Sequence, residues 1–201
     1  MKTIVLCCCL CLWLAVFSGG TALMLRYENI AGSTGDAPAV WPAASRIERT
    51  PGRATLIMLA HPKCPCTLVS IEAFSALLAE NTDRVTAHVL FLKPERAGAD
   101  WTQTSLWRAA AAIPGASVSC DDTGAEAARF GSETSGDVLL YDAHGHLTFH
   151  GGLTAARGRT GPSLGQNALG ALLAGIRPTQ STTPVFGCPL NSPQSCPTSI
   201  R

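Results

Sequence analysis

The protein has 201 residues and a formal net charge of +1, with 14% charged and 46% apolar residues. A chain this neutral lacks the basic surface that nucleic acids require, and a chain this apolar does not belong among intrinsically disordered proteins. We therefore expect one globular domain of ordinary size with no nucleic-acid partner.

The first predicted element is an uncharged apolar segment from Ile4 to Leu25, which contains four of the nine cysteines. It is long enough to cross a hydrocarbon core of ~30 Å as a helix. Lys2 precedes it, which favours a cytoplasmic N-terminus and an exported body. A cleaved signal peptide is the alternative, with Ser18–Ala22 as the small-residue cleavage region. Residues 1–26 are thus predicted to be a membrane anchor or a signal peptide.

A segment without apolar periodicity follows over residues 27–53. It contains Pro38, Pro42 and Pro51, which interrupt helices. We predict a flexible linker there. The sequence leaves open whether Trp41 lies near the membrane surface or packs on the domain.

The body, over residues 54–176, alternates strand and helix patterns. Strands are predicted over 54–60, 85–92, 116–120, 138–142 and 147–150, and helices over 68–78, 102–112, 125–130 and 166–174. This order predicts an α/β sandwich around a mixed sheet. Residues 177–201 are predicted to form a Pro-, Ser- and Thr-rich tail that carries Cys188 and Cys196.

Cysteine positions argue against a simple disulfide framework. Five cysteines remain outside the apolar N-terminal segment, and an odd number cannot pair completely within one chain. Cys120 ends a predicted strand and is expected to be a buried free thiol. Cys188 either pairs with Cys196 or folds back onto the motif at Cys64, as a resolving thiol or a metal ligand.

Cys64-Pro65-Cys66 lies where the first predicted strand of the body ends and a helix begins. The unpaired N–H groups of a helix N-terminus stabilise a thiolate, and proline suits the first helical turn. A disulfide across one residue is expected to be strained and easily reduced. We predict catalytic thiol–disulfide exchange, in which Cys64 attacks and Cys66 resolves.

Two alternatives to exchange remain open at this stage. Two close thiolates also suit a soft ion such as Cu(I), in which case the protein is a copper chaperone. Its ligands would come from His61, Cys64, Cys66 and Cys188. The exchange function needs no cofactor. The other alternative is a redox-inactive interaction module, in which the thiols have no role.

Several segments resemble the RedB-like group of membrane-anchored thioredoxin-like proteins. They are His61-Pro-Lys-Cys-Pro-Cys66, Thr134-Ser-Gly-Asp-Val-Leu-Leu-Tyr-Asp142 with Gly145, Phe149-His-Gly-Gly-Leu-Thr154, Ala156-Arg-Gly158 and Phe186-Gly-Cys-Pro189. The resemblance covers residues 54–190. It implies a thioredoxin-like three-layer α/β/α sandwich with a mixed central sheet, preceded by a transmembrane helix. One departure is that residues 134–137 lack the proline that thioredoxins place opposite the active cysteines.

These expectations combine into one prediction. The protein would be a single-pass protein of the bacterial inner membrane whose soluble domain faces the periplasm. It would act as a thiol–disulfide oxidoreductase through Cys64 and Cys66, with protein thiols or disulfides as its partners.

Overall fold

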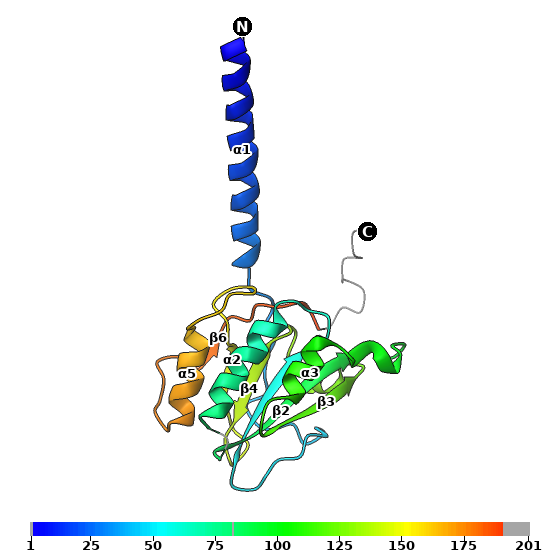
Figure 1. Ribbon diagram of the computed structural model, residues 1–201. Helices are drawn as coiled ribbons and strands as arrows, with labels where there is room; N and C mark the ends of the chain where they lie inside the picture. Colours follow the sequence, from blue (N-terminus) through cyan, green and yellow to red (C-terminus); the bar gives the residue numbers. More distant parts are fainter. Residues whose placement is uncertain (1, 82, 191–201) are drawn as a thin grey trace. The chain divides into compact units, whose positions relative to one another are not determined.

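The computed structural model describes residues 2–81 and 83–190, which divide into two units, one up to Ile30 and one from Ala31 onward. The first unit is the helix α1 (Lys2–Glu28), visible as one continuous rod in Figure 1. Its large apolar side chains are exposed along its length. The helix is long and apolar enough to cross a membrane, as the sequence predicts.

The second unit is built on one mixed sheet of six strands, in the order β3-β2-β1-β4-β5-β6. The strands are β1 (Ala54–Ala60), β2 (Val85–Lys93), β3 (Ala116–Asp122), β4 (Asp137–Tyr141), β5 (Leu147–Gly152) and β6 (Thr182–Thr183). The central strand β1 runs parallel to β2 and antiparallel to β4, so Ile57 pairs with His88 on one side and Leu139 on the other. The predicted mixed sheet is confirmed.

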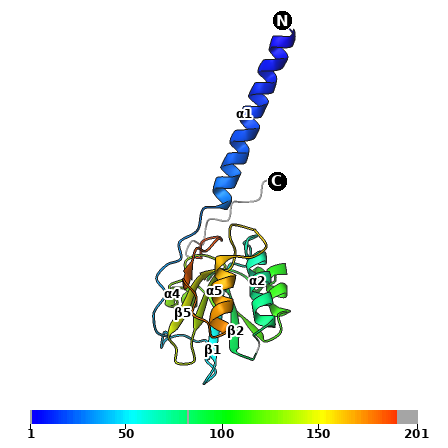
Figure 2. The ribbon, with the colours of Figure 1, turned by 90° about the vertical axis from the view of Figure 1, so that its left-hand side faces the viewer.

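Helices cover the sheet on both faces. The elements are α2 (Thr67–Ala79), the short 3₁₀ helix η1 (Ala99–Thr102), α3 (Ser105–Ala111), α4 (Ala125–Arg129) and α5 (Leu164–Leu173). Helices α2, α3 and α5 pack on one face, while α4 packs on the other; Figure 2 shows α4 and α2 on opposite sides of the strands. The three-layer α/β/α arrangement follows.

The apolar core has two halves because successive side chains of a strand point to opposite faces. Leu56 and Met58 of β1 share a buried cluster with Phe74 of α2 and Leu169 of α5. Their neighbours on β1, such as Ile57, join a second cluster on the α4 face, which also contains Phe130, Leu139 and Tyr141. A strand buried on both faces explains why β1 reads as an uninterrupted apolar run.

Residues 32–53 pack on this second face, where the sequence predicted a flexible linker. The Trp41 ring lies edge-on to Phe130 at 5.0 Å and to Tyr141 at 5.2 Å between centroids. The main-chain N–H of Trp41 donates to Gly145 O at 2.8 Å. The Arg49 guanidinium lies 5.4 Å from the Trp41 centroid. Helix α4 is too short to cover this face, and the segment around Trp41 covers the remainder.

Replacing Trp41 with alanine should lower the free energy of unfolding by about 2–4 kcal/mol, somewhat below the value for a fully buried tryptophan, because Trp41 is half-buried. Urea unfolding of the detergent-solubilised protein, followed by circular dichroism, measures this change. Trp13→Ala in α1 is the matched control. Equal stability of the two variants would show that the segment behaves as a free linker.

Two further regions differ from the sequence-based expectations. Cys120, expected to be buried, is exposed, because β3 is the edge strand of the sheet and this side chain lies outside both core clusters. The described part of the predicted tail is ordered into the domain: it contributes β6 beside β5 and then the segment Val185–Leu190. Cys196 and its predicted pairing with Cys188 lie outside the described residues.

Candidate active site

The Cys64-Pro65-Cys66 motif forms the turn between β1 and α2. The N–H of Cys64 donates to His61 O at 3.1 Å, and the N–H of Thr67 donates to Cys64 O at 3.1 Å. Cys66 is the N-cap residue of α2. Cys64 is completely buried, and Cys66 is partly exposed. The motif therefore lies at the N-terminus of α2, which is the positive end of the helix.

Hydrogen bonds to its sulfur lower the pKa of Cys64 to about 5. The strongest comes from the Cys188 thiol, and others come from the Thr67 hydroxyl and the main-chain N–H groups of Cys188 and Cys66. The Cys188 nitrogen lies 3.3 Å from the Cys64 sulfur. Burial opposes this effect but does not overcome it. At neutral pH Cys64 is a thiolate, the form that attacks disulfides.

Cys66 has the opposite environment. Burial and the negative charge of Cys64 raise the pKa of the Cys66 thiol, although Arg157, which hydrogen-bonds to it, partly offsets them. The two cysteines of the motif therefore differ in protonation at neutral pH. One is a thiolate and the other a neutral thiol.

Ser135 organises the surroundings of Cys64. Its hydroxyl accepts a hydrogen bond from His61 N at 2.7 Å and lies 2.6 Å from the Thr67 hydroxyl. A serine hydroxyl has one proton. When Ser135 donates that proton to Thr67, the Thr67 proton is left for the Cys64 sulfur. The sequence drew attention to residues 134–137 for a family resemblance and for a missing proline, but it did not predict the role of Ser135.

The segment Val185–Leu190 follows β6 and lies across this site, held by isolated β-bridges and main-chain hydrogen bonds. The N–H of Ser135 donates to Cys188 O at 2.8 Å, and the N–H of Leu190 donates to Glu133 O at 2.8 Å. Thr134 pairs antiparallel with Pro189, and Gly32 pairs antiparallel with Val185. Cys188, one of the two tail cysteines, is thus brought to Cys64.

The comparisons with known proteins concern the fold. No family model and no curated protein matches the sequence. A solved uncharacterised conserved protein from Geobacillus kaustophilus is 18% identical, with a TM-score of 0.58 over 83% of this chain and 94% of that one. A hypothetical protein from Sinorhizobium meliloti is 19% identical, with a TM-score of 0.57 over 81% and 94%. A secreted disulfide oxidoreductase from Mycobacterium tuberculosis is 19% identical, with a TM-score of 0.45 over 63% and 84%.

The topology decides the fold class. A parallel β1–α2–β2 unit, an antiparallel β4–β5 hairpin beside β1 and a closing helix α5 surround a cysteine motif at the start of α2. The fold is thioredoxin-like. β3 and β6 extend the sheet on its two edges, and residues 32–53 complete the layer that α4 begins.

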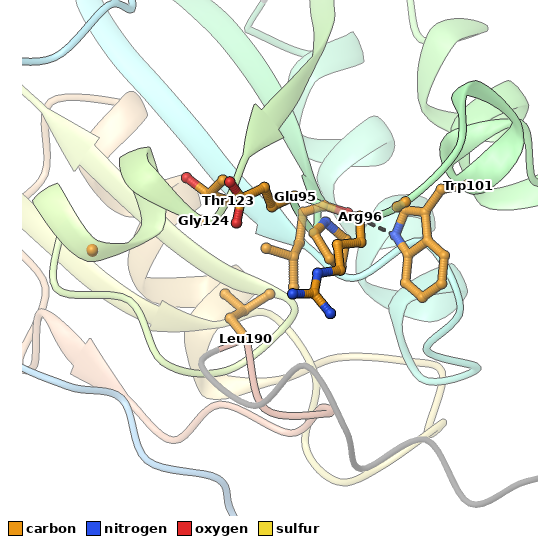
Figure 3. A pocket seen from close by; sticks show the side chains of 10 residues that line it. Glu95, Arg96, Trp101, Thr123, Gly124 and Leu190 are labelled. Atoms are coloured by element: carbon orange, nitrogen blue, oxygen red, sulfur yellow. Dashed lines mark hydrogen bonds between the residues drawn. The ribbon is translucent and has the colours of Figure 1, made fainter.

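A pocket of about 700 Å³ opens beside the cysteine motif. Figure 3 shows Trp101 and Leu190 on two sides of it, with the indole N–H of Trp101 bonded to Leu92 O at 3.1 Å. The Lys63 ammonium lies 3.6 Å from the Trp101 centroid, and the His61 ring lies edge-on at 6.1 Å. Trp101 therefore contacts the residues before Cys64 and also lines the pocket. No local sequence pattern predicts that it does both.

His61 supports the turn of the motif. Its Nδ1 accepts a hydrogen bond from Lys63 N at 3.1 Å. Burial lowers the pKa of His61, with partial opposition from the charge of Cys64, so the ring is neutral at pH 7. Over residues 2–81 and 83–190, no group of three His, Cys, Asp or Glu side chains is arranged to hold a metal ion. Of the predicted copper ligands, the structure brings Cys188 to Cys64 and directs His61 Nδ1 to the main chain.

Proposed function

We propose that the protein is a membrane-tethered thiol–disulfide oxidoreductase that acts outside the cytoplasm. Cys64 is the nucleophile, and protein thiols or disulfides are its partners. The single observation that carries the proposal is the thiolate environment of Cys64 at the start of α2, with four hydrogen bonds directed at one sulfur. A buried cysteine with no function has no need of such an arrangement, because it packs as a small neutral apolar side chain.

The main chain beside Cys64 supports binding of an extended peptide. Thr134 and Ser135 already pair with the segment around Cys188 and Pro189, whose Cys188 nitrogen contacts the Cys64 sulfur. Strand pairing supplies affinity without regard to sequence, while a side-chain pocket supplies selectivity. The pocket between Trp101 and Leu190 lies at the end of that segment and is suited to a partly apolar side chain.

Helix α1 supports attachment to a membrane. Its apolar composition fits a single-pass anchor of the bacterial inner membrane, and Lys2 at its start favours a cytoplasmic N-terminus. The domain would then face the periplasm, where disulfides persist. A cleaved signal peptide leads to the same compartment without the tether.

Copper binding is the second candidate, since the Cys64 thiolate with the neighbouring thiols of Cys66 and Cys188 resembles the soft donor set that Cu(I) prefers. We rank it below exchange because the described residues lack a three-ligand arrangement. Anaerobic Cu(I) titration separates the two. A stoichiometric tight site that disappears in both Cys64→Ser and Cys66→Ser would favour the copper function.

The exchange function predicts that Cys64→Ser reduces disulfide exchange to the uncatalysed rate, because a hydroxyl does not replace a thiolate nucleophile. The assay measures reduction of insulin disulfides and equilibration with glutathione, using the full protein in detergent. Cys120→Ser, which changes an exposed thiol away from the site, is the control and should retain wild-type activity. Wild-type exchange in Cys64→Ser would refute the proposal.

A further inference from the structure

We infer that Cys188 is the resolving thiol of Cys64, and that the segment Val185–Leu190 occupies the position where a substrate strand would bind. This inference deepens the proposed exchange function and rests on it. A second thiol must release the product from Cys64. The sequence assigned that step to Cys66, but the contacts at the site favour Cys188.

The first argument is the position of Cys188, which hydrogen bonds fix next to Cys64. Its carbonyl accepts from Ser135 N at 2.8 Å, and its own N–H points to the Cys64 sulfur at 3.3 Å. Its thiol donates to the same sulfur. The Arg157 guanidinium fixes the neighbouring peptide by donating to Gly187 O at 2.5 Å. Cys188 is therefore held on both sides with its sulfur already against Cys64.

The second argument is the close fit of Gly187. A β-carbon at this position would collide with the carbonyl oxygen of Ser135, so the strand approaches the site more closely than any other residue type permits. Cys64 has no exposed surface in this arrangement, and the Cys188 nitrogen lies 3.3 Å from its sulfur. A substrate therefore reaches Cys64 only when this segment lifts, and the segment returns with a thiol positioned on Cys64.

The third argument concerns charge at each stage. In the reduced protein, the hydrogen bond to the Cys64 thiolate is the main cause that raises the pKa of Cys188, and Arg157 opposes it. When Cys64 forms a mixed disulfide, its negative charge disappears, whereas Arg157 remains. Cys188 thus becomes more acidic at the stage at which it must attack.

The steps balance without another reagent. Cys64 attacks one sulfur of a substrate disulfide, that S–S bond breaks, and the departing substrate thiolate takes up a proton. Cys188 then loses its proton and attacks the Cys64 sulfur, which breaks the mixed disulfide and releases the second substrate thiol. Two protein thiols are oxidised to a Cys64–Cys188 disulfide, and one substrate disulfide is reduced. A dithiol protein restores the reduced form by the reverse sequence.

Cys66 is the less suitable partner. The Cys66 thiol also contacts the Cys64 sulfur, but a disulfide between residues 64 and 66 would close a tight ring across a single intervening residue, which strains the bond. Cys188 belongs to a separate strand, 124 residues away in sequence, and has no such restriction. Cys66 stays beside Arg157 as a neutral thiol.

The assignment is tested by counting the thionitrobenzoate that is released when Ellman's disulfide reacts with the protein. The full protein in detergent would carry alanine at the six other cysteines, Cys7, Cys8, Cys9, Cys11, Cys120 and Cys196. With one equivalent of Ellman's disulfide per protein, so that no reagent is left for Cys66, attack by Cys64 releases one thionitrobenzoate and leaves an adduct, and resolution releases the second. We expect two equivalents from this parent and from its Cys66→Ser variant, with a Cys64–Cys188 peptide in the mass spectrum. Cys188→Ser should release one equivalent and keep the adduct on Cys64.

The other outcomes are distinguishable. A second release at the parental rate in Cys188→Ser, or an adduct that persists in Cys66→Ser, would overturn the assignment and leave the exchange function standing. Failure of Cys64 to react in the parent would instead refute the exchange function itself. The first release also reports folding, because each serine variant should show it at the parental rate.

Discussion

Replacing Cys188 with alanine should move the midpoint of Cys64 alkylation upward from about pH 5 by about 1–2 pH units. The Cys188 thiol is the strongest of the hydrogen-bond donors that lower the pKa of Cys64. A hydrogen bond to a charged group contributes about 1.5–3 kcal/mol, and about 1.4 kcal/mol corresponds to one pH unit. The direction follows because removal of a donor to the thiolate favours the protonated form.

The measurement is the rate of iodoacetamide reaction at the Cys64 peptide from pH 4 upward, quantified by mass spectrometry. Cys188→Ser is the matched control, because its hydroxyl keeps a donor on the same strand; its midpoint should lie closer to that of the wild type. Both variants retain the donor at Thr67 and the N–H groups at the start of α2. A midpoint that does not change in Cys188→Ala would mean that the strand does not rest on Cys64 in solution.

Most elements of the domain were predictable from the sequence because they depend on local pattern, whereas η1 and β6 were not predicted. Residues 54–60 form an apolar run since β1 is buried on both faces, and apolar residues at helical spacing locate α2. The position of Cys64 and Cys66 at the start of α2 followed from these two elements alone. Helix α1 was similarly evident, because length and lack of charge are sufficient to indicate it.

The parts that escaped prediction depend on contacts between distant residues. The segment around Trp41 has no periodicity, and only its contacts with the rings of Phe130 and Tyr141 explain why it packs there. Ser135 acts through hydrogen bonds to residues 68 and 74 positions away. Burial of Cys120 was predicted incorrectly, because the sequence does not reveal that β3 is an edge strand.

The pKa of Cys64 depends both on a local feature that the sequence reveals and on contacts between distant residues. The helix N-terminus, which the sequence reveals, would lower the pKa of a thiol in any protein of this fold. Among the hydrogen bonds that lower the pKa of Cys64, the strongest comes from the Cys188 thiol. The sequence left two alternatives for Cys188, namely pairing with Cys196 or folding back onto Cys64. A motif thus indicates where a thiol is reactive, whereas tertiary contacts determine how reactive it is and which partner it meets.

Gly187→Ala should expose Cys64 to a bulky maleimide about 30- to 2,000-fold faster than in the wild type. The added β-carbon has no space against the Ser135 carbonyl, so the strand must withdraw. Withdrawal breaks the bonds from Ser135 N to Cys188 O and from Cys188 N to the Cys64 sulfur. The first bond contributes about 0.5–1.5 kcal/mol and the second, to a charged sulfur, about 1.5–3 kcal/mol; about 1.4 kcal/mol is a factor of ten in the open population.

The same substitution at Gly170 is the control, because that position in α5 has room for a methyl group and lies away from the thiols. Labelling of Cys64 in the reduced protein, read by peptide mass spectrometry, should rise in Gly187→Ala and remain unchanged in Gly170→Ala. The yield of Cys64–Cys188 disulfide after oxidation should fall in parallel, because the two sulfurs are no longer held together. If labelling rises while the disulfide yield stays at the wild-type level, the strand only shields Cys64. Its close approach would then make no contribution to pairing the two thiols.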